Sequence, residues 1–308
     1  MKRTLKNLLI AFPAMFLLSA CGGGGGGGSA IGGGGGPAPF TKWSDITPPT
    51  TVTTSGISQD GSYISPAPTY TVTSLTDHGT STASSATITY GAGGAVERIS
   101  INTPHTTVTW DQASGDVFTV TPSVTAVNDP AGTKVGVAAE PTFWGWDYQT
   151  FGLWVTGRGL GSGTLGAITV GAPTAGSAIP VAGSATFTGW SSGLYLNATG
   201  TVDSITDAPL TVNANFVTRT LNLATTGSGK TSMQTAIFTA APNLDMTGTL
   251  TYAAGTNSFT GPVTATGGMT GTSTGQFYGP NAEELGGVFS LTGVVGVESH
   301  AGAYGAKQ

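Results

Sequence analysis

The sequence predicts an all-β protein, because short alternating segments recur between glycine turns and the composition favours strands over helices. Only 8% of the 308 residues are Asp, Glu, Lys or Arg, and fifty are glycine. Threonine and serine fill most of the polar positions. This composition is poor in strong helix formers, so long amphipathic helices are not expected.

The clearest strand signal lies in residues 210–216, where every second side chain is apolar. The alternation resumes at Leu221 and Leu223, after a reversal at residues 218–219, which predicts a hairpin with one buried face. Further strands are predicted at residues 86–90, 95–102, 106–110, 246–252 and 258–264. Many short antiparallel strands with close turns indicate a sandwich or a closed barrel, and closure would remove exposed sheet edges.

The N-terminal segment has the pattern of an export signal. Three basic residues, Lys2, Arg3 and Lys6, precede an apolar run at residues 8–18. Leu18-Ser19-Ala20 then leads into Cys21, the one cysteine of the chain, and this sequence resembles the lipobox of bacterial lipoproteins. The apolar run is about half the roughly 20 residues that a spanning helix needs. We therefore expect residues 1–20 to be a signal peptide and Cys21 to carry the lipid; the alternative is an ordinary secretory signal with a chance cysteine.

Residues 21–49 are expected to form a tether. Glycine dominates from Gly22 to Gly36, prolines follow, and compact structure is expected to begin near residue 50. Gly22 occupies the position where aspartate signals retention in the inner membrane in many lipoproteins. The lipoprotein rule thus implies an anchor in the outer membrane, with the folded part at the cell surface.

The charge balance excludes one class of partner. Loss of residues 1–20 would leave seven basic residues against fifteen acidic ones, which is a formal charge of −8. Nucleic acids are not expected as partners, because phosphate binding needs clustered Lys and Arg.

Residues 275–289, GQFYGPNAEELGGVF, carry a specific family resemblance. They resemble the closing motif of the barrel domain of transferrin-binding-protein-B-like surface lipoproteins, in which a strand ending in FYGP meets an acidic turn and returns through a GG-aromatic strand. Residues 184–200 look like the opening barrel strand of that family, and residues 210–226 and 304–307 also fit. Residues 151–180 resemble the end of the preceding handle domain, whereas residues 50–140 match only in being rich in strands.

The resemblance implies a β-rich handle domain over residues 50–175 and an eight-stranded antiparallel β-barrel over residues 176–308. Members of the family capture host iron proteins, haem or complement regulators. We therefore expect a binding protein without enzymatic activity or a cofactor, with a protein ligand and a TonB-dependent receptor as candidate partners. The alternatives are a haem or small-ligand carrier that feeds an outer-membrane transporter, and a structural or adhesive coat lipoprotein.

The acidic turn in this motif has a structural interpretation. Asn281 is expected to cap a single helical turn, in which Glu283 and Glu284 benefit from the helix dipole. Adjacent residues in such a turn point about 100° apart and cannot act together on one bond, so a pair of catalytic carboxylates is not expected.

Catalytic signatures occur by chance in a chain so rich in Gly, Ser and Thr. Ser191 and Ser273 each lie in a GxSxG pattern, but strand-like sequence follows both, whereas a nucleophile elbow needs a following helix. Residues 224–231 miss the P-loop pattern by its first glycine, and the GxGxxG at residues 161–166 also precedes a strand-like segment. We assign no catalytic residue.

Histidine is sparse, with only His78, His105 and His300. None is paired at the spacing typical of metal ligands, so no metal site is expected. Haem-capturing relatives place axial ligands in the handle domain, which would contain His78 and His105, but a solvated loop position is the alternative for each.

An aromatic segment at residues 143–158 supplies the candidate ligand-binding residues. These are Trp144, Trp146, Tyr148, Trp154 and Arg158. Trp, Tyr and Arg are enriched among the residues that anchor protein interfaces. The alternative is a hydrophobic plug between the handle and the barrel.

Overall fold

The computed structural model describes residues 41–201 and 203–308, with the side chain of Asp203 left out. Residues 1–20, the lipidation site Cys21 and the glycine segment lie outside the described residues, so the predictions about them stay predictions. Within the described ranges, no helix has the length and apolar character needed to cross a membrane.

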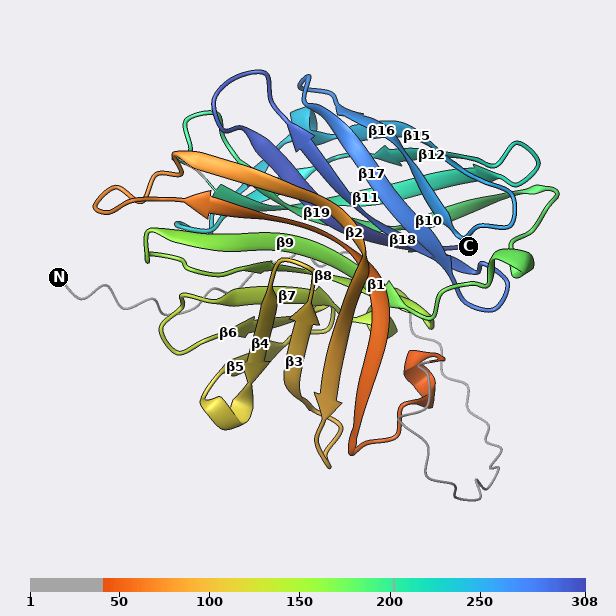
Figure 1. Cartoon of the computed structure of the whole chain (residues 1–308), viewed down its shortest axis with the longest axis horizontal. Helices are drawn as coiled ribbons and strands as arrows, with labels where there is room; N and C mark the ends of the chain where they lie inside the picture. The colour runs from red at the N-terminus through yellow and green to blue at the C-terminus, as the bar shows by residue number, and fades with distance from the viewer. Residues whose placement is uncertain (1–40, 202) are drawn as a thin grey trace. The chain divides into compact units, whose positions relative to one another are not determined.

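The first of two large sheets contains nine antiparallel strands in the order β4-β3-β2-β1-β9-β8-β7-β6-β5 (Figure 1). The strands are β1 (Thr50–Ile64), β2 (Ser74–Tyr90), β3 (Val96–Asn102), β4 (Thr107–Asp111), β5 (Val117–Val120), β6 (Val124–Asn128), β7 (Val135–Ala139), β8 (Gln149–Val155) and β9 (Ser162–Gly171). Side chains of β2, β3 and β4 pack with side chains of β6, β8 and β9, so the sheet curls around a core of its own. Its outermost strands, β4 and β5, are not paired with each other.

The second sheet forms the barrel. Its strands are β10 (Ser184–Leu196), β11 (Asp203–Asn215), β12 (Thr220–Thr225), β13 (Gly229–Ser232), β14 (Phe238–Ala240), β15 (Met246–Tyr252), β16 (Ser258–Ala265), β17 (Thr270–Tyr278), β18 (Glu284–Thr292) and β19 (Ser299–Lys307). Pairing of β10 with both β19 and β11 closes eight of these strands into a ring, and β13 and β14 extend from β11. The predicted all-β class with a closed eight-stranded antiparallel barrel is confirmed.

Among the described residues, helical structure is confined to single turns. These are η1 (Trp43–Asp45), η2 (Gln112–Ser114), α1 (Pro141–Trp144), η3 (Gly176–Ala178) and η4 (Pro242–Leu244).

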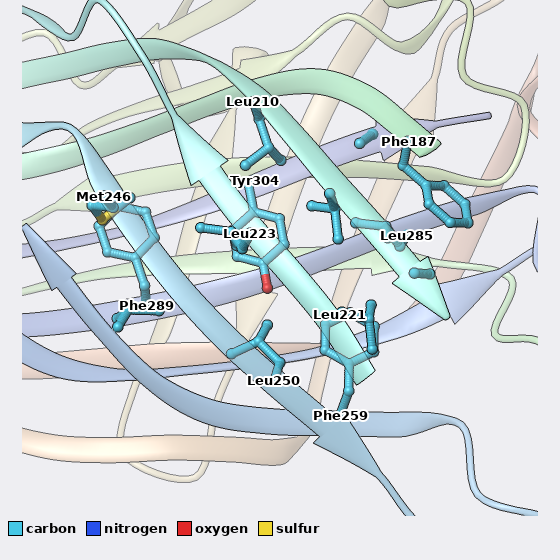
Figure 2. Packing of buried hydrophobic residues seen from close by; sticks show 14 of the residues in the cluster. Phe187, Leu210, Leu221, Leu223, Met246, Leu250, Phe259, Leu285, Phe289 and Tyr304 are labelled. Carbon is cyan, nitrogen blue, oxygen red and sulfur yellow. The ribbon is translucent and has the colours of Figure 1, made fainter. Parts of the chain in front are cut away.

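The barrel interior is the largest hydrophobic core of the protein, and Figure 2 shows its side chains converging from several strands. Leu221 and Leu223 of β12 point inward, as the alternation predicted, and Phe289 of β18 is fully buried among them. Ser191 and Ser273 lie in the middle of β10 and β17, so neither occupies a strand-to-helix turn.

Compact structure begins earlier than the tether prediction placed it. Trp43 is buried, and its indole N–H donates to the carbonyl of Gln149 at 2.9 Å. This contact could not be predicted, because proline-rich composition carries no information about a single aromatic side chain that docks onto a distant strand.

Candidate functional site

The aromatic segment at residues 143–158 lies where the first sheet meets the barrel. Side chains of successive residues in β8 point to opposite faces of the sheet. Phe151 and Leu153 therefore face Val288 of β18 and Ala303 of β19 in a core between the two sheets. Trp154 faces the other way, into the internal core of the first sheet, where it is buried.

Three tryptophans form a stack across this junction. The Trp144 ring lies between Trp146 and Trp190 of β10, with ring centres 5.7 and 5.2 Å away and interplanar angles of 20° and 27°. The Trp144 indole also donates to the carbonyl of Ser123 at 3.1 Å. Trp146 is buried, so the protein itself covers this candidate binding residue as well as Trp154.

Phe143 forms the exposed end of the same aromatic series. Its ring meets the Trp144 ring edge-on, with the centres 5.0 Å apart, and 54% of the residue is accessible to solvent. Val117 and Val120 of the edge strand β5 are also exposed. Ser123, which accepts the Trp144 hydrogen bond, follows that strand directly. The exposed Phe143 therefore belongs to the segment that contacts the turn between β5 and β6.

Glu284 joins the barrel to the start of β8. Its carboxylate accepts hydrogen bonds from the backbone N–H groups of Asp147, Tyr148 and Gln149, at 2.5, 3.0 and 3.0 Å. Burial raises the pKa of Glu284 to about 7, although these three hydrogen bonds lower it. The carboxylate thus fixes the backbone that carries the aromatic segment.

The predicted helical turn in this motif is wrong. Glu284 is the first residue of β18, and the Asn281 amide donates to the Glu283 carboxylate at 2.8 Å instead of capping a helix. The expectation failed because the strongest partners of Glu284 are more than 130 residues away in sequence.

The paired glycines that follow Glu284 have a steric role. A side chain at Gly286 would collide with the Thr169 hydroxyl of β9, and one at Gly287 would collide with the ring of Tyr304. The GG pair therefore lets β18 approach the first sheet on one face and lets an aromatic side chain fill the barrel on the other.

A cavity of about 360 Å³ lies between the two sheets. Arg158 lines it together with apolar and aromatic side chains of both sheets, including Tyr63, Leu165, Leu194 and Tyr195. Cavities of this size hold small ligands in many proteins. The cavity lining includes Arg158 but none of the three stacked tryptophans. Tyr148 is partly buried against Gly279 of the barrel. The five candidate residues do not form one continuous surface.

Sequence spacing did not reveal one cluster in the first sheet. His78 and His105 converge on the carboxylate of Asp60, and a ligand atom of each of the three residues lies within 4.8 Å of the others. The two histidines are 27 positions apart in sequence, so their spacing did not indicate that they lie together. His300 lies elsewhere, buried in the barrel, where desolvation lowers its pKa to about 3 and keeps it neutral.

Residues 179–308 match the family described as the C-lobe and N-lobe beta barrels of Tf-binding protein B. The match contains every strand of the barrel, from β10 to β19. It confirms the resemblance that the sequence predicts for this part of the chain.

Among solved structures, the chain is similar to a mutant of transferrin-binding protein B from Haemophilus parasuis Hp5, with 14% sequence identity and a TM-score of 0.45. The similarity covers 73% of this chain and 51% of that protein. It is also similar to transferrin-binding protein B from serogroup B Neisseria meningitidis, with 16% sequence identity and a TM-score of 0.43. This similarity covers 82% of this chain and 43% of that protein. The chain thus spans about half the length of these two proteins. No curated protein matches it significantly.

Proposed function

We propose that this chain, whose residues 179–308 belong to the barrel family of transferrin-binding protein B, is a lipid-anchored surface protein of the outer membrane that binds a protein ligand. The family match of the barrel carries the proposal. The lipobox-like sequence before Cys21 and the glycine-rich segment after it support an anchor and a tether. A binding role without catalysis accords with Ser191 and Ser273, which lie within strands and not at a nucleophile elbow.

The exposed aromatic end of the first sheet is the contact surface that we propose for the ligand. Phe143 offers a large apolar side chain backed by the rigid tryptophan stack, and such pre-organised aromatic groups are effective interface anchors. The adjacent strand β5 is a sheet edge, with unpaired backbone donors and acceptors that an incoming strand could join. Of the candidates from the aromatic segment, Trp144 retains partial exposure here, whereas the partly exposed Tyr148 lies against Gly279 of the barrel.

Capture of a host iron protein, with delivery to a TonB-dependent receptor, is the specific form of this proposal. Its support is the family of the barrel. Surface location can be tested separately, by treating intact cells with a protease that does not cross the outer membrane. We expect the protein to be cleaved in intact cells while a periplasmic marker survives; protection equal to that of the marker would contradict a surface location.

The ligand surface can be tested with two matched phenylalanines. Phe143 and Phe238 of β14 are 54% and 51% exposed, but only Phe143 belongs to the proposed surface. Purified transferrin, lactoferrin and haemoglobin serve as probes in surface plasmon resonance. For a probe that binds, we expect Phe143→Ala to weaken binding by about 1 to 2 kcal/mol and Phe238→Ala to leave it unchanged. Equal effects of the two substitutions would place the ligand elsewhere.

The cavity supports a second candidate, the capture of a small ligand such as haem. Arg158 could pair with an acidic group of the ligand while the apolar walls exclude water. Haemin titration would then produce a saturable shift of the Soret band that weakens in Arg158→Ala. An unchanged spectrum, or identical titrations of the parent and the variant, would rule out haem at this position.

A further inference from the structure

Three residues that lie far apart in the sequence meet on one side of the first sheet. Asp60 belongs to β1, His78 to β2, and His105 to the connection between β3 and β4. The Oδ1 atom of Asp60 lies 3.1 Å from Nδ1 of His78 and 3.0 Å from Nδ1 of His105. The two imidazole ring centres are 4.6 Å apart. Two imidazole nitrogens and one carboxylate oxygen therefore lie within 4.8 Å of one another.

A β-bulge brings His78 into this position. Asp60 pairs with Gly79, and the next residue, Gly61, pairs with Asp77, so His78 has no partner opposite it in β1. Gly79 has a φ of +83°, which glycine adopts without steric cost. Bulges redirect side chains, and this one turns the imidazole toward Asp60.

The carboxylate at the centre of the cluster is buried, whereas the imidazoles are accessible. The side chain of Asp60 is 2% exposed, and those of His78 and His105 are 23% and 41% exposed. Among the described residues, the two histidines are the only salt-bridge partners of Asp60. The open side of the cluster is where a cation could enter.

We propose that Asp60, His78 and His105 bind a divalent transition-metal cation of the borderline class that includes Zn²⁺. Two imidazole nitrogens and one carboxylate oxygen are a common ligand set for such cations, with water completing the coordination. The Thr103 hydroxyl donates to Oδ2 of Asp60 at 2.5 Å and orients the carboxylate, as supporting groups around metal ligands do. The cation would connect β1, β2 and the β3–β4 connection.

Two other roles for the cluster make different predictions. In the first, the three residues form a hydrogen-bonded group without a metal. Both histidines would then donate from Nδ1 to the same oxygen of Asp60, and no stoichiometric cation would bind. Haem held between the two histidines is excluded by the geometry, because both rings approach one oxygen and their centres are too close to accommodate a porphyrin plane between them.

The test uses the full chain without a polyhistidine tag and with Cys21→Ser, which removes the only thiol. After the metal is stripped, the protein is titrated with Co²⁺, whose visible absorption reports nitrogen and oxygen ligation, and then with Zn²⁺. We expect one Co²⁺ per chain, displaced by Zn²⁺, and a rise in melting temperature with either metal. His78→Ala and His105→Gln should each weaken Co²⁺ binding at least about tenfold and abolish the thermal shift.

Two variants keep this test decisive. His105 lies in an exposed connection, so His105→Gln should leave the circular dichroism spectrum unchanged and can be tested even if His78→Ala fails to fold. Asp45→Asn alters an exposed carboxylate of η1 that interacts with Thr41 and Lys42 and not with the cluster, so it should keep full metal affinity. The proposal is overturned if the parent binds no stoichiometric metal, or if a folded His105→Gln variant binds it as tightly as the parent.

Discussion

The carboxylate of Glu284 accepts a hydrogen bond of 3.0 Å from the backbone N–H of Gln149 and so joins the first residue of β18 to the first residue of β8. Two further backbone N–H groups, those of Asp147 and Tyr148, donate to the same carboxylate. One acidic side chain of the barrel motif thereby satisfies three consecutive donors that precede a strand of the other sheet. Loss of that acceptor would leave buried donors unpaired, which is costly.

Glu284→Gln should therefore destabilise the protein. Glutamine keeps one oxygen acceptor. Its NH₂ group replaces the second carboxylate oxygen and cannot accept a hydrogen bond from the backbone N–H groups there. We expect the free energy of unfolding at pH 7 to fall by about 1 to 3 kcal/mol, as measured by urea denaturation. Glu283→Gln, at the neighbouring position, serves as the control and should change stability by less than about 0.5 kcal/mol.

The same residue predicts a pH dependence of stability. The pKa of Glu284 rises from 4.5 to about 7 on folding, so the folded state binds more protons than the unfolded chain between these values. The part of the stability that comes from this proton binding is therefore fully present below about pH 4.5 and is lost as the pH rises through 7, whereas the hydrogen bonds to the three backbone N–H groups remain. The parent should lose stability across this window relative to Glu284→Gln, whose side chain does not titrate. Parallel pH profiles for the two proteins would contradict the pKa shift.

Phe289→Ala should remove a well-packed side chain from the barrel core. Phe289 is 2% exposed and lies among the side chains of the largest hydrophobic cluster. We expect a loss of about 3 to 5 kcal/mol in the free energy of unfolding, from lost transfer energy and the cavity left behind. Phe238→Ala, at an exposed phenylalanine of β14, should cost less than about 0.5 kcal/mol in the same denaturation experiment.

The barrel hairpins could be predicted because their signal is local. Alternating apolar residues at positions 210–216 and at Leu221 and Leu223 fix which face is buried, and the intervening reversal sets the pairing of β11 with β12. The alternation alone does not distinguish a closed barrel from a sandwich. Closure depends on the pairing of β10 with β11 and β19.

The functional features could not be predicted in this way because they depend on contacts between distant segments. His78 reaches Asp60 only through a bulge, and His105 only because the β3–β4 connection lies beside β1. Glu284 looked like part of a local turn, but its partners precede β8. Trp144 and Trp154 looked equivalent in sequence, although Trp144 packs against the core between the two sheets and Trp154 lies in the internal core of the first sheet.

Cys21→Ser should release the protein from the membrane. The lipid chains expected on Cys21 would anchor the protein by about 0.8 kcal/mol per buried CH₂ group, and serine cannot accept them. Fractionation of cells should find the variant outside the membrane pellet, whereas Ser29→Ala, in the same glycine-rich segment, should remain in it. A Cys21→Ser protein that stays with the membrane would contradict the lipid anchor.

Trp146→Ala and Phe143→Ala should separate folding from binding within the aromatic segment. Trp146 is buried between the sheets, with its ring 5.7 Å from Trp144 and 5.8 Å from Phe151, so truncation should cost about 3 to 5 kcal/mol of stability. Phe143 is exposed, so its truncation should change stability by less than about 0.5 kcal/mol while weakening the ligand. Circular dichroism during urea denaturation gives the stabilities, and binding is then corrected for the folded fraction. If Trp146→Ala keeps the parental stability, the tryptophan stack does not hold the two sheets together. The proposal that the stack is a rigid support for Phe143 would then be contradicted as well.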